Sequence, residues 1–300
     1  MTIVSLGIDI GGTKTAFGLV DPQGKAVRRS RVPTEPNQPL ERLVDVIGAE
    51  VDRWKAESDK WTIAGVGIGC AGPVDSEKGT IENQDSLPHW MGAPVVALLT
   101  SRLGIGNAVL DNDANAAALG EARFGDSEPA GSLMMLTFGT GVGGGFIAAG
   151  TPYRGVDGAH PEFGMTPVAV ESPAGVQVNS LEEFASGEGI RRRAADRGLL
   201  VPSAGDIFSM ADAGHAVALE IIGWAMQATA WGAWTLAHTY LPEVIAVGGG
   251  VAAKQSNRYL GAIRDGLNRA RLVPNERIQV RLATASEDAG MIGAAALAMQ

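Results

Sequence analysis

The sequence predicts an α/β protein built from two similar α/β domains. The 300 residues suffice for two domains of ordinary size, and 45% of them are apolar. Strand patterns alternate with patterns of helical period along the chain. One pattern, a strand, a glycine-threonine turn, a second strand and another turn, occurs at residues 3–24 and again at 131–150. This repetition indicates an internal duplication, with one copy in each domain.

The first half begins with a β-meander, in which the turn PQGK joins the second and third strands. Apolar residues at helical spacing follow it, and the later elements are bounded by glycine and proline. The predicted strands are 3–10, 15–21, 26–34, a strand that starts at 63 and runs into a glycine-proline loop ending at 74, and one that starts at 107; the predicted helices are 39–57, 92–104 and the alanine-rich stretch before 125.

The second half repeats the strand pattern and then becomes mainly helical. Glu220, Gln227, two glycines and three tryptophans interrupt the apolar stretch 216–241, so it is interpreted as a buried core helix and not a membrane span. The predicted helices are 180–198, 203–213, 216–240, 252–271 and 287–299, and the predicted strands are 243–249 and 278–284. We expect one domain at 1–113, joined by the final helix at about 287–300, and the other at 114–286.

Composition excludes several classes of protein. The net charge of −9 argues against duplex DNA as a partner, and the run Arg191-Arg192-Arg193 is interpreted as a solvated helix face. The single cysteine, Cys70, excludes an intramolecular disulfide and a cysteine-rich zinc site. The N-terminal residues lack the basic region and cleavage site of a signal peptide, so a cytoplasmic location is expected.

Glycine-rich turns are the first candidate for chemistry. The turn Gly11-Gly12-Thr13 can present N–H and hydroxyl groups to phosphate oxygens with no side chain in the way. Asp9, at the mouth of this turn, could hold Mg²⁺ directly or through water. The alternative is an ordinary glycine hairpin.

Two further glycine-rich stretches make a nucleotide site the favoured interpretation. GTGVGGG at 139–145 matches the first turn, and AVGGGV at 246–251 ends a strand where an adenosine could lie against backbone. Neither the P-loop spacing nor a G-x-G-x-x-G at a strand-to-helix turn is present. The predicted nucleotide site is therefore of neither the P-loop nor the Rossmann kind.

Acidic and amide side chains lie between a predicted strand and helix in LDNDANAAALGE, residues 110–121. Asp113 is the candidate general base, with Asp111 expected to face the same cleft. The alternative role for Asn112 and Asp113 is helix capping, which these residue types often perform.

The sequence resembles the ROK family of sugar kinases, in the actin-like ATPase superfamily. The resemblance covers essentially the whole chain and rests on motifs in order: DIGGTKTAFGLVD, GIGCAGPVD, LDNDANAAALGE, LTFGTGVGGGFIAAG, EEFASG, VGGGV and AGMIGAAALA. It implies two duplicated domains of ribonuclease H-like fold around a central cleft. It also implies that ATP with Mg²⁺ is bound by two phosphate loops. The implied nucleotide and metal residues are Asp9, Gly11, Gly12, Thr13, Lys14, Thr140, Gly141, Gly249 and Gly250.

The resemblance also implies a sugar site. Asp113 would take the proton from the sugar hydroxyl, and Asn112 would bind the sugar. Glu162 and Glu182 would accept hydrogen bonds from further hydroxyls, and Gly72 would line the same site. A capping box of Ser180 and Glu183 is an alternative interpretation of the segment that holds Glu182.

The sequence departs from the family pattern where the family binds a structural zinc. Met165 stands in place of the zinc-binding histidine, and no cysteine lies between 166 and 182. We therefore expect no zinc. That histidine usually also contacts the sugar, and nearby His160 is a candidate to replace it. Asn83 and Ser86 are both candidates for a further sugar-binding position.

The predicted activity is transfer of the γ-phosphoryl group of ATP to the 6-hydroxyl of a hexose, with glucose favoured. The alternatives are a fructokinase, an N-acetylhexosamine kinase, a polyphosphate-using glucokinase, a non-catalytic sugar-sensing regulator and an actin-like filament protein. A repressor would need an N-terminal helix-turn-helix, whereas the first strand here is expected at Ile3. The tryptophans of 224–234, with the resemblance, predict a homodimer or homotetramer without nucleic-acid or membrane partners.

Overall fold

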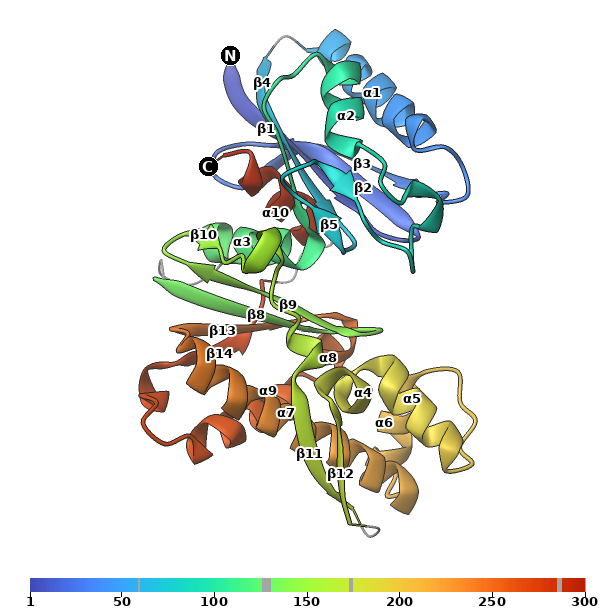
Figure 1. Cartoon of the computed structure of the whole chain (residues 1–300), viewed down its shortest axis with the longest axis vertical. Helices are drawn as coiled ribbons and strands as arrows, with labels where there is room; N and C mark the ends of the chain where they lie inside the picture. The colour runs from blue at the N-terminus through green and yellow to red at the C-terminus, as the bar shows by residue number, and fades with distance from the viewer. Residues whose placement is uncertain (59, 126–130, 173–174, 285–287, 300) are drawn as a thin grey trace. The chain divides into compact units, whose positions relative to one another are not determined.

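The structure is a computed structural model that describes residues 1–58, 60–125, 131–172, 175–284 and 288–299 (Figure 1). Contacts divide the chain into two compact units. Unit 1 comprises Met1–Pro129, Gly145–Pro161 and Thr284–Gln300, and unit 2 comprises Ala130–Gly144 and Glu162–Ala283. This division differs from the expected boundary after residue 113. Helix α3 (Asp113–Phe124) stays in unit 1 because it packs against α10 (Ala289–Leu297).

Unit 1 contains a five-stranded sheet in the order β3-β2-β1-β4-β7. The first three strands of the chain form an antiparallel meander, and β1, β4 and β7 run parallel. All five strands were expected from the sequence. Their bounds are β1 (Thr2–Ile10), β2 (Lys14–Val20), β3 (Ala26–Pro33), β4 (Trp61–Cys70) and β7 (Ala108–Asn112).

The alternation of side chains along β1 separates the two faces of this sheet. Val4, Leu6, Ile8 and Ile10 join the core formed with α1 (Leu40–Glu57) and α2 (Val95–Leu103). The intervening positions, which include Gly7 and Asp9, face α10. Figure 1 shows α1 and α2 on one side of the sheet and α10 on the other. The period of two therefore directs the Asp9 carboxylate into a packed layer.

Helix α10 approaches β1 and β4 so closely that only glycine fits beneath it. A Cβ on Gly7 would lie 2.0 Å from the Met291 carbonyl oxygen, and one on Gly67 would lie 1.7 Å from the Ala294 carbonyl oxygen. Both obstacles are backbone atoms, which cannot move without displacing the helix. The glycines of GID and GVGIG therefore set the distance between the helix and the sheet.

We expect Gly67→Ala to destabilise unit 1 by about 3 kcal/mol or more, because the added methyl group forces α10 away from the sheet. The matched control is Gly106→Ala, since a Cβ there has nothing within 4 Å. Chemical denaturation of both variants measures the difference. Equal stabilities would show that α10 can shift without cost.

The second sheet has the order β10-β9-β8-β13-β14, which repeats the plan of the first. Strand β13 pairs in parallel with both β8 and β14, as β4 pairs with β1 and β7. The duplication predicted from the two glycine-threonine turns is therefore confirmed. The strand bounds are β8 (Ser132–Phe138), β9 (Val142–Ala148), β10 (Thr151–Pro152), β13 (Val244–Gly248) and β14 (Gln279–Leu282).

The helices of unit 2 pack around α7, a helix of 25 residues that contacts α4, α5, α6 and α9. Twelve of its residues are buried, as expected for a core helix. Within the described part of the chain, no helix has both the length and the apolar character needed to cross a membrane. The bounds are α4 (Leu181–Ala185), α5 (Gly187–Asp196), α6 (Ala204–Asp212), α7 (Ala216–Tyr240), α8 (Gly250–Lys254) and α9 (Ser256–Arg269).

Several short elements of the structure were not expected from the sequence. The largest is an antiparallel hairpin in the segment where the family carries its zinc-binding cysteines. Val168 and Val170 are buried and Val176 and Val178 exposed, so the alternating valines on both sides of the sequence SPAG were the available signal. The missed elements are β5 (Val74–Asp75), β6 (Thr80–Ile81), β10, β11 (Pro167–Ser172), β12 (Gly175–Ser180), η1 (Pro88–Trp90), η2 (Val156–Gly158), η3 (Phe163–Met165) and η4 (Asn275–Arg277).

Candidate active site

The residues of unit 1 that were predicted to take part in catalysis lie at the carboxyl ends of its parallel strands. Asp9 lies opposite Gly69, and Gly69 lies opposite Asp111, so β1, β4 and β7 end together. Asn112 and Asp113 continue directly from β7 into α3. The crevice at the carboxyl ends of parallel strands is the usual ligand site of open α/β sheets.

Burial changes the acidity of Asp9. Desolvation, followed by the nearby negative charge of Asp113, raises the pKa of Asp9 from 3.8 to about 6, although Lys14 and Arg31 act in the opposite direction. A Cβ on Gly290 would lie 2.3 Å from Asp9 Oδ2, so this carboxylate rests directly on the first turn of α10. Asp9 therefore occupies a site where an added positive charge would be strongly favoured.

Asn112 and Asp113 both take part in the start of α3. Asn112 Oδ1 accepts hydrogen bonds from the N–H groups of Ala114 (2.8 Å) and Asn115 (3.4 Å), and Asp113 Oδ1 accepts one from Ala114 (2.8 Å). The capping role considered for these residues is thus present, with Asn112 as the cap. Capping uses one carboxylate oxygen of Asp113 and is compatible with a catalytic role for the other.

Gly72, Asn112 and His160 lie close together within unit 1. A Cβ on Gly72 would lie 2.4 Å from Asn112 Nδ2 and 3.4 Å from His160 Cε1. The structure therefore brings His160 beside two of the predicted sugar residues. Asn83, one of two candidates for a further contact, instead donates to the carbonyls of Ala71 and Gly72.

The first glycine turn is braced from outside. Thr34 Oγ1 donates to the Gly11 carbonyl at 2.6 Å, and the Thr34 N–H donates to the Thr13 carbonyl at 3.1 Å. The Gly11 N–H donates to the Lys14 carbonyl, so Gly11 shapes the turn. Neither Gly11 nor Gly12 has a left-handed φ; Gly12 is instead close to Ser86, whose Cβ would be 3.2 Å from an added Cβ. Thr34 directly follows β3 and belongs to no glycine-rich or acidic motif, so no sequence signal indicated its contact with the turn.

Asp111 has a different role from the one expected. Its Oδ2 accepts a hydrogen bond from Arg154 Nη2 at 2.5 Å, and the aspartate is 2% exposed. Its Oδ1 accepts hydrogen bonds from the Asn112 N–H and from Asn115 Nδ2. Asp111 is therefore held in a buried ion pair. Arg154 lies 43 positions further along the chain, so no local signal could reveal the pair.

The second glycine turn, in unit 2, is docked on the start of α5. The Gly139 and Thr140 carbonyls accept hydrogen bonds from the N–H groups of Gly187 and Glu188, at 2.8 and 3.1 Å. Gly139 N–H donates to the Gly141 carbonyl, which parallels the bond that shapes the first turn. This turn is therefore held rigidly by unit 2.

Glu182 contacts the second turn directly. Its Oε2 accepts a hydrogen bond from the Val142 N–H at 2.8 Å, and a Cβ on Gly141 would lie 2.4 Å from the same oxygen. Ser180 caps α4 by accepting from the Glu183 N–H, which is one half of the expected capping box; the Ser180 N–H donates to Asn179 Oδ1 and not to Glu183. Glu182 is thus a positioned carboxylate at the turn and not only a first-turn helix residue.

Glu162 begins a short irregular segment. It directly precedes η3, and its carbonyl accepts a hydrogen bond from the Met165 N–H at 3.0 Å. The Met165 residue, at the position of the family's zinc-binding histidine, is 52% exposed. Across the described residues, no group of three or more His, Cys, Asp and Glu is arranged to hold a metal.

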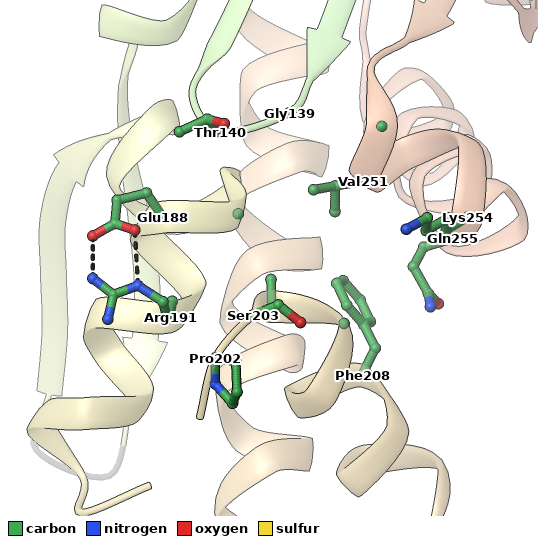
Figure 2. A pocket seen from close by; sticks show the side chains of 14 residues that line it. Gly139, Thr140, Glu188, Arg191, Pro202, Ser203, Phe208, Val251, Lys254 and Gln255 are labelled. Carbon is green, nitrogen blue, oxygen red and sulfur yellow. Dashed lines mark hydrogen bonds and ion pairs between the residues drawn. The ribbon is translucent and has the colours of Figure 1, made fainter. Parts of the chain in front are cut away.

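A pocket of about 550 Å³ lies in unit 2, beside the second turn (Figure 2). Gly249 follows β13 with φ at +89°, and a Cβ there would lie 2.4 Å from the Phe138 carbonyl oxygen, so only glycine fits. The described residues that line the pocket are Gly139, Thr140, Gly187, Glu188, Arg191, Pro202, Ser203, Ala204, Gly205, Phe208, Gly250, Val251, Lys254 and Gln255.

The walls of the pocket combine apolar and polar groups. Figure 2 shows the Phe208 ring facing Val251 and Lys254 across the opening. Arg191 donates twice to Glu188, at 2.8 and 2.5 Å. Residues 191–193 were expected to form a solvated helix face. This expectation is wrong for Arg193, which is half-buried and whose guanidinium lies 3.8 Å from the centroid of the Phe184 ring. A volume and lining of this kind suit an organic ligand with a planar ring.

Comparison with known proteins identifies the class. The model of the ROK family matches residues 5–300. A glucokinase of Streptomyces coelicolor is 32% identical, with 99% of this chain and 98% of that protein covered. A ROK family glucokinase from Streptomyces griseus, solved in complex with glucose and AMPPNP, is 32% identical, with a TM-score of 0.74 and 99% of each chain covered. The ROK hexokinase of Thermus thermophilus has a TM-score of 0.84 at 28% identity, over 98% of this chain and 97% of that one.

The chain belongs to the ROK family. Its fold is that of the ROK sugar kinases, a two-unit α/β fold of the actin-like ATPase kind. Both expectations drawn from the motifs are confirmed.

Proposed function

We propose that the protein is an ATP-dependent glucokinase that transfers the γ-phosphoryl group to the 6-hydroxyl of glucose. Its membership of the ROK family and the glucokinase relatives support this activity. The observation that carries the proposal is the cluster at the strand ends of unit 1, where Asp113 lies near Asp9 and next to Asn112. Such a pair of acidic groups suits one proton acceptor and one cation site.

The sugar is bound by groups that match its hydroxyls. In unit 1, Asp113 accepts the proton of the attacking hydroxyl, and Asn112 and His160 hydrogen-bond other hydroxyls. In unit 2, Glu162 and Glu182 are the candidate acceptors for further hydroxyls. Asn112 and His160 both lie beside Gly72, so the two side chains can contact the same sugar. A sugar of the wrong stereochemistry would leave buried carboxylates and amides unpaired, which is the physical basis for discrimination.

Each unit carries groups suited to the donor. In unit 1, Gly12, Thr13 and Lys14 offer N–H, hydroxyl and ammonium groups to phosphates. In unit 2, Thr140 and Gly141 offer N–H and hydroxyl groups beside the pocket. Gly249 and Gly250 let the nucleoside approach the backbone after β13. Catalysis by such groups consists mainly of positioning and charge stabilisation.

The lining of the pocket favours ATP over polyphosphate. Its cations are Arg191, which is paired with Glu188, and Lys254. A polyphosphate chain needs a row of cations, whereas a nucleoside needs an apolar surface such as that of Phe208 and Val251. Polyphosphate therefore remains the second candidate donor.

Magnesium fits the surroundings of Asp9. The partly buried carboxylate of Asp9 carries a raised pKa of about 6, which a bound cation would offset. Carboxylate and phosphate oxygens are the ligands that Mg²⁺ prefers. When bound beside Asp9, directly or through water, Mg²⁺ would neutralise charge on the β- and γ-phosphates.

A coupled assay of ADP release tests the substrate and donor. Glucose, fructose, mannose and N-acetylhexosamines are compared, each with ATP and with polyphosphate through direct detection of the sugar phosphate. We expect the highest kcat/KM for glucose with ATP. A higher value for fructose or an N-acetylhexosamine would reassign the acceptor, and the lack of turnover with every pair would favour a sugar-sensing regulator.

We expect purified protein to contain no stoichiometric zinc. Met165 offers no imidazole, and the only cysteine, Cys70, lies buried at the end of β4 in unit 1. Metal analysis by mass spectrometry after dialysis measures this directly. About one zinc per chain would contradict it.

We also propose a homodimer or homotetramer. On α7, Trp224 is buried while Trp231 is 36% exposed and stacks edge-on against Trp234, so part of the tryptophan cluster reaches the surface. Light scattering at micromolar concentration is expected to give a mass of two or four times the 31.0 kDa of one chain. A particle of the monomer mass would exclude this proposal.

A further inference from the structure

Segment 149–161 is connected to the end of β7 by the ion pair of Arg154 and Asp111. The Arg154 side chain is 33% exposed and that of Asp111 is 3% exposed, so the carboxylate end of the pair is dry. Asp111 uses its two oxygens on different partners. One accepts from the Asn112 N–H and Asn115 Nδ2, and the other accepts from Arg154. The pair therefore links the strand end that carries Asn112 to a distant segment of unit 1.

The segment beyond Arg154 is closed on itself. The Gly155 N–H donates to the Ala159 carbonyl at 2.7 Å, and the Ala159 N–H donates to the Val156 carbonyl at 3.0 Å. Residues 155 and 159 are consequently adjacent, with Arg154 immediately before this turn and His160 immediately after it. Whatever fixes Arg154 therefore also fixes the position of His160.

On its other side the segment is anchored by backbone. The Tyr153 N–H donates to the Phe146 carbonyl at 2.7 Å, and the two rings meet edge to face. These contacts hold Tyr153 beside β9, and they involve no residue at the carboxyl ends of β1, β4 and β7. The ion pair, by contrast, connects the turn 155–159 with the residues around Asn112.

We propose that Arg154 is a positioning residue for sugar binding. Its ion pair with Asp111 holds the turn 155–159 so that His160 faces Gly72 and Asn112, where it contacts a sugar hydroxyl. This inference rests on the proposed hexokinase function. The competing explanation is a buried ion pair that only stabilises unit 1, and removal of either partner alone would leave a buried charge unpaired under both explanations.

The double variant Arg154→Met with Asp111→Asn separates the two explanations. It leaves no unpaired buried charge, so its melting temperature should recover relative to either single variant. The amide oxygen introduced at position 111 can still accept from the Asn112 N–H and Asn115 Nδ2, while the uncharged amide nitrogen takes the place of the oxygen that accepted from Arg154, so the tie to residue 154 is lost. We expect KM for glucose to rise about tenfold or more in this variant, because misplaced contacts weaken binding and reaction together. KM for ATP should stay within about twofold, since the ion pair holds no donor residue.

Two comparisons complete the kinetic test. Arg154→Lys keeps the charge and should recover a large part of the lost sugar affinity. The matched control is the double variant Arg102→Met with Asp52→Asn. In the wild type, Arg102 Nη2 of α2 donates to Asp52 Oδ2 of α1 at 2.9 Å. Both KM values should be unchanged in this control. A double variant at 111 and 154 with restored melting temperature and wild-type KM for glucose would overturn the inference.

A readout independent of turnover uses the four histidines of the chain. Labelled imidazole signals are recorded by NMR, with His160→Gln used to assign His160. Glucose should shift the His160 signal in the wild type and not in the double variant. An active wild type without such a shift overturns the inference alone, whereas a wild type that neither binds nor phosphorylates any hexose overturns the proposed function and this inference together.

Discussion

Asp113→Asn should lower kcat by about 10²–10⁴-fold while leaving sugar affinity and stability nearly unchanged, because general-base catalysis contributes about this much. The asparagine removes the proton acceptor but keeps the size of the side chain. Its amide oxygen can still accept the 2.8 Å hydrogen bond from the Ala114 N–H, and Asn112 remains as the cap of α3. Steady-state kinetics with glucose and ATP, together with glucose titration by calorimetry, measure both parts.

The matched control for this prediction is Asp265→Asn, at an exposed aspartate of α9. It makes the same chemical change and should leave kcat unaltered. If Asp113→Asn kept turnover near that of the wild type, the base would have to be sought elsewhere. Asp111 would not be an attractive substitute, because its carboxylate is engaged by Arg154, Asn112 and Asn115.

Asp9→Asn should lower kcat by about 10²-fold or more and at the same time make the ligand-free protein more stable at pH 7. The rate falls because a group that holds a charge-neutralising cation near the phosphates is lost. The stability rises because burial raises the folded-state pKa of Asp9 from 3.8 to about 6, which means that ionised Asp9 disfavours folding at neutral pH. The shift corresponds to about 3 kcal/mol.

The sign of the pH dependence follows from the same raised pKa. Below pH 3.8 Asp9 is protonated in both states and has no effect on stability; between pH 3.8 and about 6 the unfolded state loses its proton first, and the folded state becomes progressively less favoured. The stability difference between Asp9→Asn and wild type should therefore be small at pH 4 and largest above pH 6. Thermal unfolding across this range, without nucleotide or Mg²⁺, measures it.

Activity provides the second arm of this test. Mg²⁺-dependent turnover of the wild type should decline as the pH falls through about 6, because protonated Asp9 cannot hold the cation. Raising the Mg²⁺ concentration should move the decline to lower pH. An Asp9→Asn variant that is both less stable and fully active would show that Asp9 is a structural residue.

The sequence by itself determined the long strands and helices of the fold and the location of much of the candidate chemistry. The alternation in β1, the helical spacing of α1 and the αL-prone Gly104 at the end of α2 are local signals, and each produced the expected element. The glycine-threonine turn occurs twice in the sequence, and the two sheets of the structure share one strand order. Asn112 was recognised as a possible cap because capping depends on residues within three positions of each other.

Only the tertiary structure decided which distant groups meet. It paired Asp111 with Arg154, set Asp9 on Gly290 and directed Glu182 to the Val142 N–H. It also placed Asn83 so that its amide donates to the carbonyls of Ala71 and Gly72. The side-chain periods of helices and strands follow from the local backbone conformation, so the sequence of a single chain reveals them. The pairing of side chains tens or hundreds of positions apart depends instead on how sheets and helices pack, and this packing also desolvates Asp9 and so raises its pKa.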